Sequence, residues 1–135
     1  MVEVVYYSMT GNTKKLADAI AGELGVAAEK VSTDTRLADE SLVFLGTGLY
    51  GPYQGFKDFI NRTDFASRKV ALFGTSGAGR GREVEALEEA VSAKGADIVG
   101  RFHCRGEFLF LLNRNRPRSE DLENARAFAR QVTGG

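Results

Sequence analysis

The sequence predicts an α/β domain in which helices cover both faces of a doubly wound parallel sheet. Short runs of β-branched and aromatic residues alternate along the chain with segments whose apolar residues recur at helical spacing. Strands that alternate with helices favour parallel pairing, because each right-handed crossover lays its helix back on the sheet. Polar, glycine-containing turns follow several of the predicted strands, at the positions where open parallel sheets bind their ligands.

Five segments have the composition of strands. The first, Val2 to Tyr7, is short, apolar and followed at once by a polar turn, which is typical of a buried strand. The other four are residues 28–32, 42–46, 70–73 and 98–102, and the first of these is the weakest pattern. Five strands with helices between them fit a doubly wound sheet.

Four helices are predicted between or after these strands. Leu16, Ile20 and Leu24 line the first helix, and Gly25 ends it. The last helix is expected to begin near Ser119 as its N-cap, followed by two carboxylates that suit the helix dipole. The inner faces of the last three helices are formed by Phe56, Phe59 and Ile60, by Val84, Leu87 and Val91, and by Leu122, Ala125, Phe128, Ala129 and Val132.

Length and composition limit the classes of function. A chain of 135 residues, 43% hydrophobic and 27% charged, predicts a single globular domain over residues 1–135. The single cysteine, Cys104, excludes an internal disulfide and a thiolate metal cluster, and a reducing cytoplasm fits best. The 18 basic residues balance 18 acidic ones, so no overall field attracts nucleic acid. No segment has the length of a membrane span, and the first residues lack the basic leader of a signal peptide.

A polar loop between the first strand and the first helix predicts a phosphate site. Its residues are Ser8, Met9, Thr10, Gly11, Asn12 and Thr13. A helix N-terminus presents unpaired N–H groups and partial positive charge, and the hydroxyl and amide side chains add further donors. The loop has neither the lysine of a Walker A motif nor the spaced glycines of a dinucleotide fingerprint. The alternative interpretation is that these residues only cap the helix and shape the turn.

This loop resembles the phosphate loop of flavodoxins, whose Thr/Ser-x-Thr-Gly-Asn-Thr pattern it matches without a gap. The resemblance extends over essentially the whole chain, with specific residues in the first loop and general pattern elsewhere. It implies a flavodoxin-like sheet of strand order 2-1-3-4-5, noncovalently bound FMN, and a role in electron transfer without catalytic residues or a metal of its own.

The resemblance places two more loops against the flavin ring. The loop after the third strand contributes Thr47, Gly48, Leu49, Tyr50, Gly51 and Tyr53. In flavodoxins a peptide of this loop turns its carbonyl toward N5 of the reduced flavin, and the backbone from Gly48 to Gly51 is the candidate here. Tyr50 is the preferred stacking residue and Tyr53 the second choice, unless either one packs on the short helix instead.

The loop after the fourth strand is expected to hydrogen-bond the pyrimidine edge of the flavin through its backbone. Its candidate residues are Thr75, Ser76, Gly77 and Gly79. Taken alone, this glycine-rich stretch is also consistent with an ordinary strand-to-helix connection.

The balanced charge departs from the strongly acidic pattern of flavodoxins. Arginines near the predicted site suggest a basic rim, which would favour an acidic redox partner or an anionic substrate. The alternative, slightly favoured by composition, is a solvated face balanced by nearby acids. The rim residues are Arg80, Arg82, Arg105, Arg114 and Arg116, with Arg101 and Arg118 beside them. We expect a monomer or weak dimer.

Three further features are not assigned to the site. His103 and Cys104 are adjacent in a strand, so their side chains point to opposite faces, and Cys104 is expected to be a small buried residue. The apolar run from Phe108 to Leu112 is expected to be a core segment, and the alternatives are a lid on the flavin side or a dimer patch.

Three functions remain open. An FMN-binding electron carrier comes first. An FMN enzyme that reduces a quinone-type acceptor with NAD(P)H is the alternative, although no separate nicotinamide motif is visible. A binding module that kept the fold and lost the flavin is the third.

Overall fold

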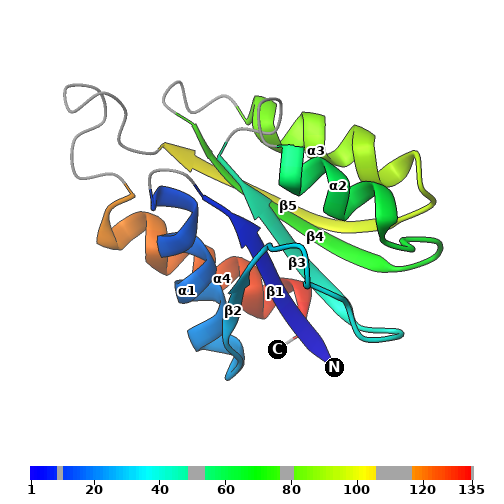
Figure 1. The fold of residues 1–135 in the computed structure, drawn as a ribbon. Helices are drawn as coiled ribbons and strands as arrows, with labels where there is room; N and C mark the ends of the chain where they lie inside the picture. Colours follow the sequence, from blue (N-terminus) through cyan, green and yellow to red (C-terminus); the bar gives the residue numbers. More distant parts are fainter. Residues whose placement is uncertain (9–10, 49–53, 77–80, 106–116, 135) are drawn as a thin grey trace.

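The computed structural model describes residues 1–8, 11–48, 54–76, 81–105 and 117–134 (Figure 1). Its strands are β1 (Val2–Tyr7), β2 (Ala28–Lys30), β3 (Leu42–Thr47), β4 (Lys69–Ser76) and β5 (Asp97–Arg105). Its helices are α1 (Asn12–Leu24), α2 (Gln54–Arg62), α3 (Arg82–Ser92) and α4 (Ser119–Val132). The alternation predicted from the sequence is confirmed, except that β2 passes to β3 without a helix between them.

All four strand pairings are parallel, in the order β2-β1-β3-β4-β5. This confirms the predicted doubly wound sheet and its strand order. The central strands β1, β3 and β4 end side by side, because Tyr7 pairs with Thr47 and Thr47 pairs with Gly74. Strands β4 and β5 are longer than predicted, since the backbones of their polar and glycine-containing ends also join the ladder.

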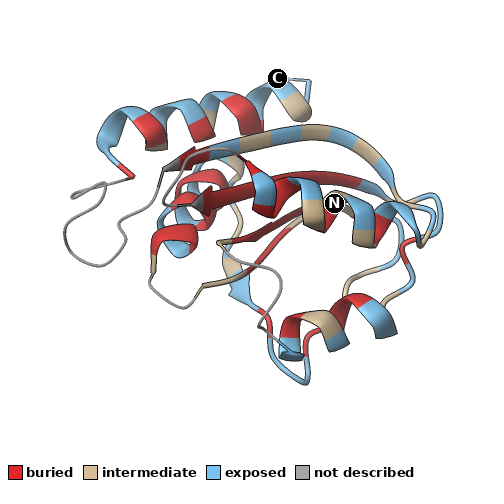
Figure 2. Cartoon of the chain, turned by 90° about the horizontal axis from the view of Figure 1, so that it is seen from above, coloured by how far each residue is buried: buried red, intermediate tan, exposed pale blue. Residues whose placement is uncertain are grey.

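The helices form one layer on each side of the sheet, and the red strands in Figure 2 lie between them. Helices α1 and α4 pack on one face, against a core that includes Val4, Phe44 and Phe73. Helices α2 and α3 cover the other face, against alternate residues of the same strands such as Val5 and Leu45. No helix in the described ranges is long and apolar enough to cross a bilayer.

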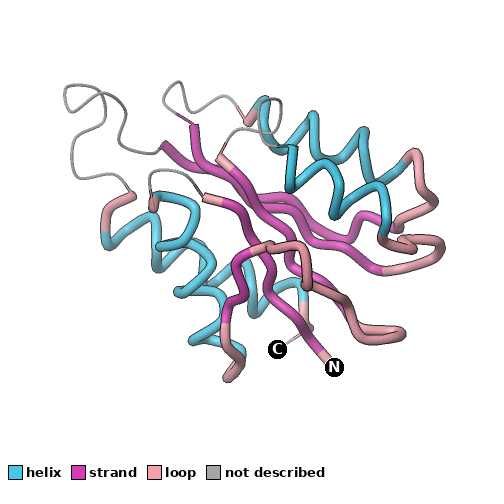
Figure 3. Tube along the Cα trace, viewed as in Figure 1, coloured by secondary structure: helices cyan, strands magenta, loops and turns pink. Residues whose placement is uncertain are grey.

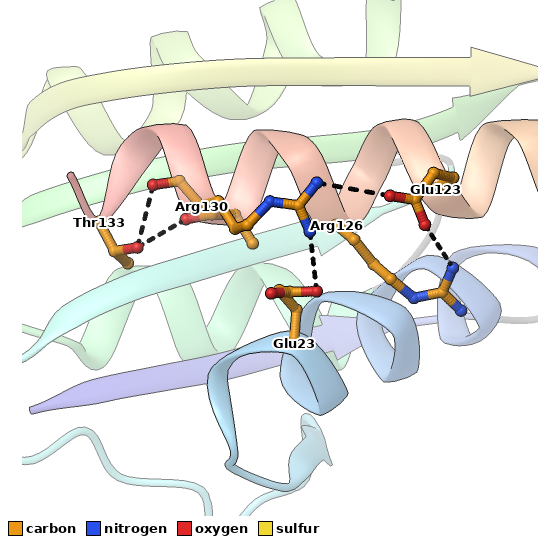
Figure 4. Close-up of polar contacts among 6 residues, drawn as sticks. Glu23, Glu123, Arg126, Arg130 and Thr133 are labelled. Carbon is orange, nitrogen blue, oxygen red and sulfur yellow. Dashed lines mark hydrogen bonds and ion pairs between the residues drawn. The ribbon is translucent and has the colours of Figure 1, made fainter. Parts of the chain in front are cut away.

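Helix α4 is joined to α1 by an ion pair, which belongs to a small exposed network on α4 (Figure 4). The Arg130 guanidinium donates to Glu23 of α1 at 3.0 Å and to Glu123 of α4 at 3.4 Å. Arg126 donates to the same Glu123 carboxylate at 3.3 Å. Of these exposed pairs, the one between Arg130 and Glu23 links the two helices that cover one face of the sheet, and the other two lie within α4.

The start of α4 corrects one prediction. Arg118 is the N-cap and Ser119 is the first helical residue, so Ser119 does not cap the helix. Asp121 decides the position, because its carboxylate accepts a hydrogen bond from the Arg118 backbone N–H at 2.8 Å. The placement of acidic residues in the first turn is confirmed.

Candidate functional site

The candidate site lies at the edge where β1, β3 and β4 end and where α1 and α3 begin. Figure 3 shows these strand ends and helix starts on the same side of the molecule. The predicted loops leave the sheet here, next to one another, because the three strands are neighbours. Of the predicted residues, the structure brings together Ser8, Gly11, Asn12, Thr13, Thr47, Gly48 and Thr75.

The first loop turns sharply into α1. Gly11 is the N-cap, with a left-handed φ of 89° that disfavours residues with a Cβ. Its backbone N–H donates to the Ser8 hydroxyl oxygen at 2.9 Å, which closes the turn. Asn12 and Thr13, predicted as loop residues, already belong to the first turn of the helix, and both are buried.

The amino end of α1 is suited to an anion. The N-cap supplies no side-chain hydrogen bond to the helix, and the first turn contains no acidic residue. The first N–H groups of a helix have no intrahelical acceptor, and together they carry a partial positive charge. An anionic ester therefore meets backbone donors here without a competing carboxylate.

Two buried threonines connect the first loop to the end of β4. The Oγ1 atoms of Thr13 and Thr75 lie 2.9 Å apart, although the residues are separated by 62 positions in the chain. Gly48, just beyond β3, lies against both of them. A Cβ at position 48 would stand 3.1 Å from the Thr13 oxygen and 3.2 Å from the Thr75 oxygen. The three predicted loops therefore meet at a single hydroxyl pair.

Glu83 is a buried residue of this edge that was not predicted from the sequence. It lies in the first turn of α3 with an exposed fraction of only 5%. Its side chain crosses Gly74: a Cβ there would fall 2.6 Å from the Glu83 Cγ and 2.9 Å from the Thr47 carbonyl oxygen. Gly74 was the available signal: it directly follows the predicted strand 70–73 and lies inside β4 as the structure has it, and a strand glycine often marks such a close approach.

His103 and Cys104 behave as predicted, on opposite faces of β5. Cys104 is buried in the core beneath α1 and α4, as expected of a small apolar residue. His103 is exposed and lies against Gly81, the N-cap of α3, where an added Cβ would come within 2.9 Å of the imidazole.

The arginines of the predicted basic rim that the structure describes differ in whether an acidic residue neutralises their charge. Arg82, in the first turn of α3, is exposed and makes no ion pair with any residue that the structure describes. Arg101 is different, because it donates two hydrogen bonds to Glu88 at 2.5 and 2.6 Å. The hydrogen bond from Arg101 also lowers the pKa of Glu88, against a smaller opposing effect of burial. The Arg101 charge is therefore compensated within the protein.

Several predicted residues lie outside the described ranges and stay predictions. They are Met9, Thr10, Leu49, Tyr50, Gly51, Tyr53, Gly77, Gly79, Arg80, Arg114 and Arg116, with the run from Phe108 to Leu112. Ser76 and Arg105 are described only as the last residues of β4 and β5.

Comparisons with known proteins agree with this arrangement. Residues 3–115 match the model of the flavodoxin domain family. A flavodoxin of Clostridium beijerinckii is 32% identical over 111 residues, covering 73% of this chain and 80% of that protein. An uncharacterized protein of Methanocaldococcus jannaschii is 27% identical over 135 residues, covering 90% of this chain and 89% of that protein.

A solved structure extends the comparison to three dimensions. The two-electron reduced flavodoxin of Megasphaera elsdenii is 28% identical, with a TM-score of 0.66, and the match covers 94% of this chain and 98% of that one. The matched family model spans most of the sequence, from the second residue of β1 to residue 115 in the segment between β5 and α4. The chain belongs to the flavodoxin family.

Proposed function

We propose that this protein binds FMN noncovalently and carries electrons between redox partners. The observation that carries the proposal is the amino end of α1, which has no side-chain cap and no acidic residue in its first turn. In a member of the flavodoxin family, this is the expected position of the flavin phosphate. The reduced state named for the Megasphaera elsdenii relative supports the electron-transfer role.

The phosphate would be held by neutral donors. The backbone N–H groups of the first turn of α1 point toward the loop, and the Thr13 hydroxyl lies in the same turn. Ser8 shapes the turn by accepting the Gly11 N–H, so its own hydroxyl proton remains available to an anion. Thr10 is expected to add another donor, as predicted from the sequence.

The ring of the flavin would lie over the ends of β3 and β4. Bound FMN supplies the group that is reduced and oxidised, while the chain positions it and sets its electrostatic surroundings. Thr47, Gly48 and Thr75 form the described part of this edge. Stacking by Tyr50 or Tyr53 and the backbone from Gly48 to Gly51 stay predictions for the ring side.

The test is to load flavin-free protein with FMN and follow its reduction. An electron carrier should bind one FMN, quench its fluorescence, and take up two electrons from a chemical reductant. NADPH alone should reduce it only slowly, because a carrier depends on a separate reductase. Rapid reduction by NADPH would favour the reductase alternative, and a protein that does not bind FMN would be the flavin-less module.

We also propose that the redox partner presents an acidic surface. Arg82 and Lys15 lie exposed in the first turns of α3 and α1, and neither forms an ion pair within the described residues. Such charges steer an oppositely charged partner and are screened by salt. Electron transfer with an acidic redox protein should therefore slow as NaCl is raised, and Arg82→Glu should slow it at low salt. A rate that is indifferent to both changes contradicts the acidic partner.

A further inference from the structure

We propose that Thr75, at the end of β4, is a positioning residue for the flavin phosphate and acts through Thr13. The inference rests on the proposed function and adds a specific residue to it. It starts from the hydroxyl pair of Thr13 and Thr75, whose oxygen atoms lie 2.9 Å apart. Both residues are almost completely buried, with exposed fractions of 1% and 3%.

The contact crosses the middle of the sheet. Thr13 follows β1 and Thr75 lies in β4, while β3 separates these two strands. The hydroxyls meet over the end of β3 because Gly48 has no side chain: its missing Cβ would approach both oxygens to 3.1 and 3.2 Å. The absence of a side chain at Gly48 therefore leaves the space in which Thr13, after β1, and Thr75, of β4, make their contact.

The hydrogen bond has a preferred direction once an anion is bound. Each threonine hydroxyl has one proton to donate and two lone pairs that accept. If Thr13 donated to Thr75, it would have no proton left for a phosphate oxygen. If Thr75 donates to Thr13, the Thr13 proton is released toward the anion, and such a charge-assisted bond is the stronger one.

The two hydroxyls then form a short chain of donors, from Thr75 to Thr13 to the phosphate. Hydrogen bonds in such chains polarise one another in a buried environment. Thr75 thereby fixes both the rotamer and the proton of Thr13 without touching the phosphate. It also couples the loop after β4, which faces the flavin ring in our proposal, to occupation of the phosphate site.

The experiment compares affinities for FMN and riboflavin, which differ only in the phosphate. Thr75→Val removes the hydroxyl and nearly preserves the shape, so FMN affinity should fall about tenfold while riboflavin affinity changes less than about twofold. Thr75→Ser should restore FMN affinity, since it returns the hydroxyl. Thr133→Val, at the end of α4 and far from the site, is the matched control and should change neither affinity.

Two further measurements separate positioning from a structural role. The ³¹P resonance of bound FMN should shift in Thr75→Val and return in Thr75→Ser. In a double-mutant cycle, Thr75→Val should have little further effect on FMN affinity once Thr13→Val is present. If Thr75→Val does not fold, the pair Thr75→Ser and Thr75→Ala isolates the hydroxyl in the same way.

The possible failures are distinguishable. If wild-type protein binds neither flavin, the proposed function itself is wrong. If wild-type protein prefers FMN but Thr75→Val keeps that preference, or loses both flavins equally, the role of Thr75 is overturned and the proposed function stands.

Discussion

Single residues at the ends of the central strands are constrained by their neighbours across the sheet. Three glycines near these strand ends have no room for a side chain: Gly46, Gly48 and Gly74. A Cβ at each would lie in or below van der Waals contact with a neighbouring group, and the group differs from one glycine to the next. At Gly48 the neighbours are the two hydroxyls of the proposed phosphate network. At Gly46 and Gly74 they are the Phe73 ring and the Glu83 side chain. The same residue type therefore serves the core at one position and the site at another.

Gly46→Ala is predicted to destabilise the protein. The added Cβ would fall 2.2 to 2.4 Å from three atoms of the Phe73 ring, and that ring is fully buried and has no room to move. We expect a loss of about 1 to 3 kcal/mol in the free energy of unfolding, measured by urea denaturation. Gly22→Ala, on the exposed side of α1 with open space around it, should instead stabilise by roughly 0.5 to 1 kcal/mol. Equal effects of the two changes would contradict this steric explanation.

The residues of the site were only partly predictable from the sequence. Ser8, Gly11 and Thr13 follow from their position between a strand and a helix, because that position fixes where the donors point. The pairing of Thr13 with Thr75 does not, since it depends on the order and register of three strands. Glu83 was missed for a similar reason: an acid in a first helical turn usually serves the dipole and stays exposed, and only the close approach of Gly74 buries this one.

Ion pairs between elements add to the packing of the two cores, and the pair that links α3 to β5 is the most readily tested. Glu88 of α3 accepts two hydrogen bonds from Arg101 of β5. The side chains are partly exposed, 31% and 54%, so solvent screens the pair. The pair therefore fixes the helix against the sheet with a modest gain in stability.

Glu88→Gln is predicted to make stability less dependent on pH. The hydrogen bond from Arg101 lowers the pKa of Glu88 in the folded protein, so its contribution is present above the ordinary carboxyl pKa and is lost as pH falls through the lowered value. The free energy of unfolding of the wild type should exceed that of the variant by no more than about 1 kcal/mol at neutral pH, and this difference should vanish in acid. Urea denaturation at several pH values measures this.

Glu89→Gln is the matched control for that experiment. Glu89 is the next residue of α3, is exposed, and forms no ion pair with the part of the chain that the structure describes. It should leave the pH profile unchanged. A difference between wild type and Glu88→Gln that grows toward low pH would contradict the assigned sign.

The elements themselves were largely predictable because two signals agree along most of the chain: the spacing of the apolar residues and the positions of the glycines that end helices and strands. Val84, Leu87 and Val91 are buried as predicted, and Gly25 ends α1 in a left-handed conformation. The errors lie at element ends, where a single local interaction decides. Asp121 moves the cap of α4 to Arg118, and the ladder extends β4 as far as Ser76.

The whole molecule differs from strongly acidic flavodoxins in carrying no net charge. Negative charge near a flavin disfavours its fully reduced anionic form, so a balanced chain should have a less negative potential for the second electron. A unit charge about 10 Å away, at an effective dielectric near 20, is worth about 1.7 kcal/mol or about 70 mV. If a redox titration gives a potential for the second electron as low as that of an acidic flavodoxin, this prediction is wrong.

Charge reversal tests whether position on the molecule matters as well as total charge. Arg82→Glu places a negative charge at the edge where β4 ends, so it should lower the potential for the second electron. Lys69→Glu makes the same change in total charge at the opposite end of β4 and should have a much smaller effect. If both variants lower the potential equally, the flavin does not lie at the proposed edge.

A titration of flavin-free protein with FMN and with riboflavin, followed by quenching of flavin fluorescence, tests whether the amino end of α1 binds the phosphate. Donors at the amino end of α1 recognise the phosphate, so FMN should bind one to one and at least about 100-fold more tightly than riboflavin. Equal affinities, or no binding of FMN, would show that the opening helix of this domain does not hold a flavin phosphate.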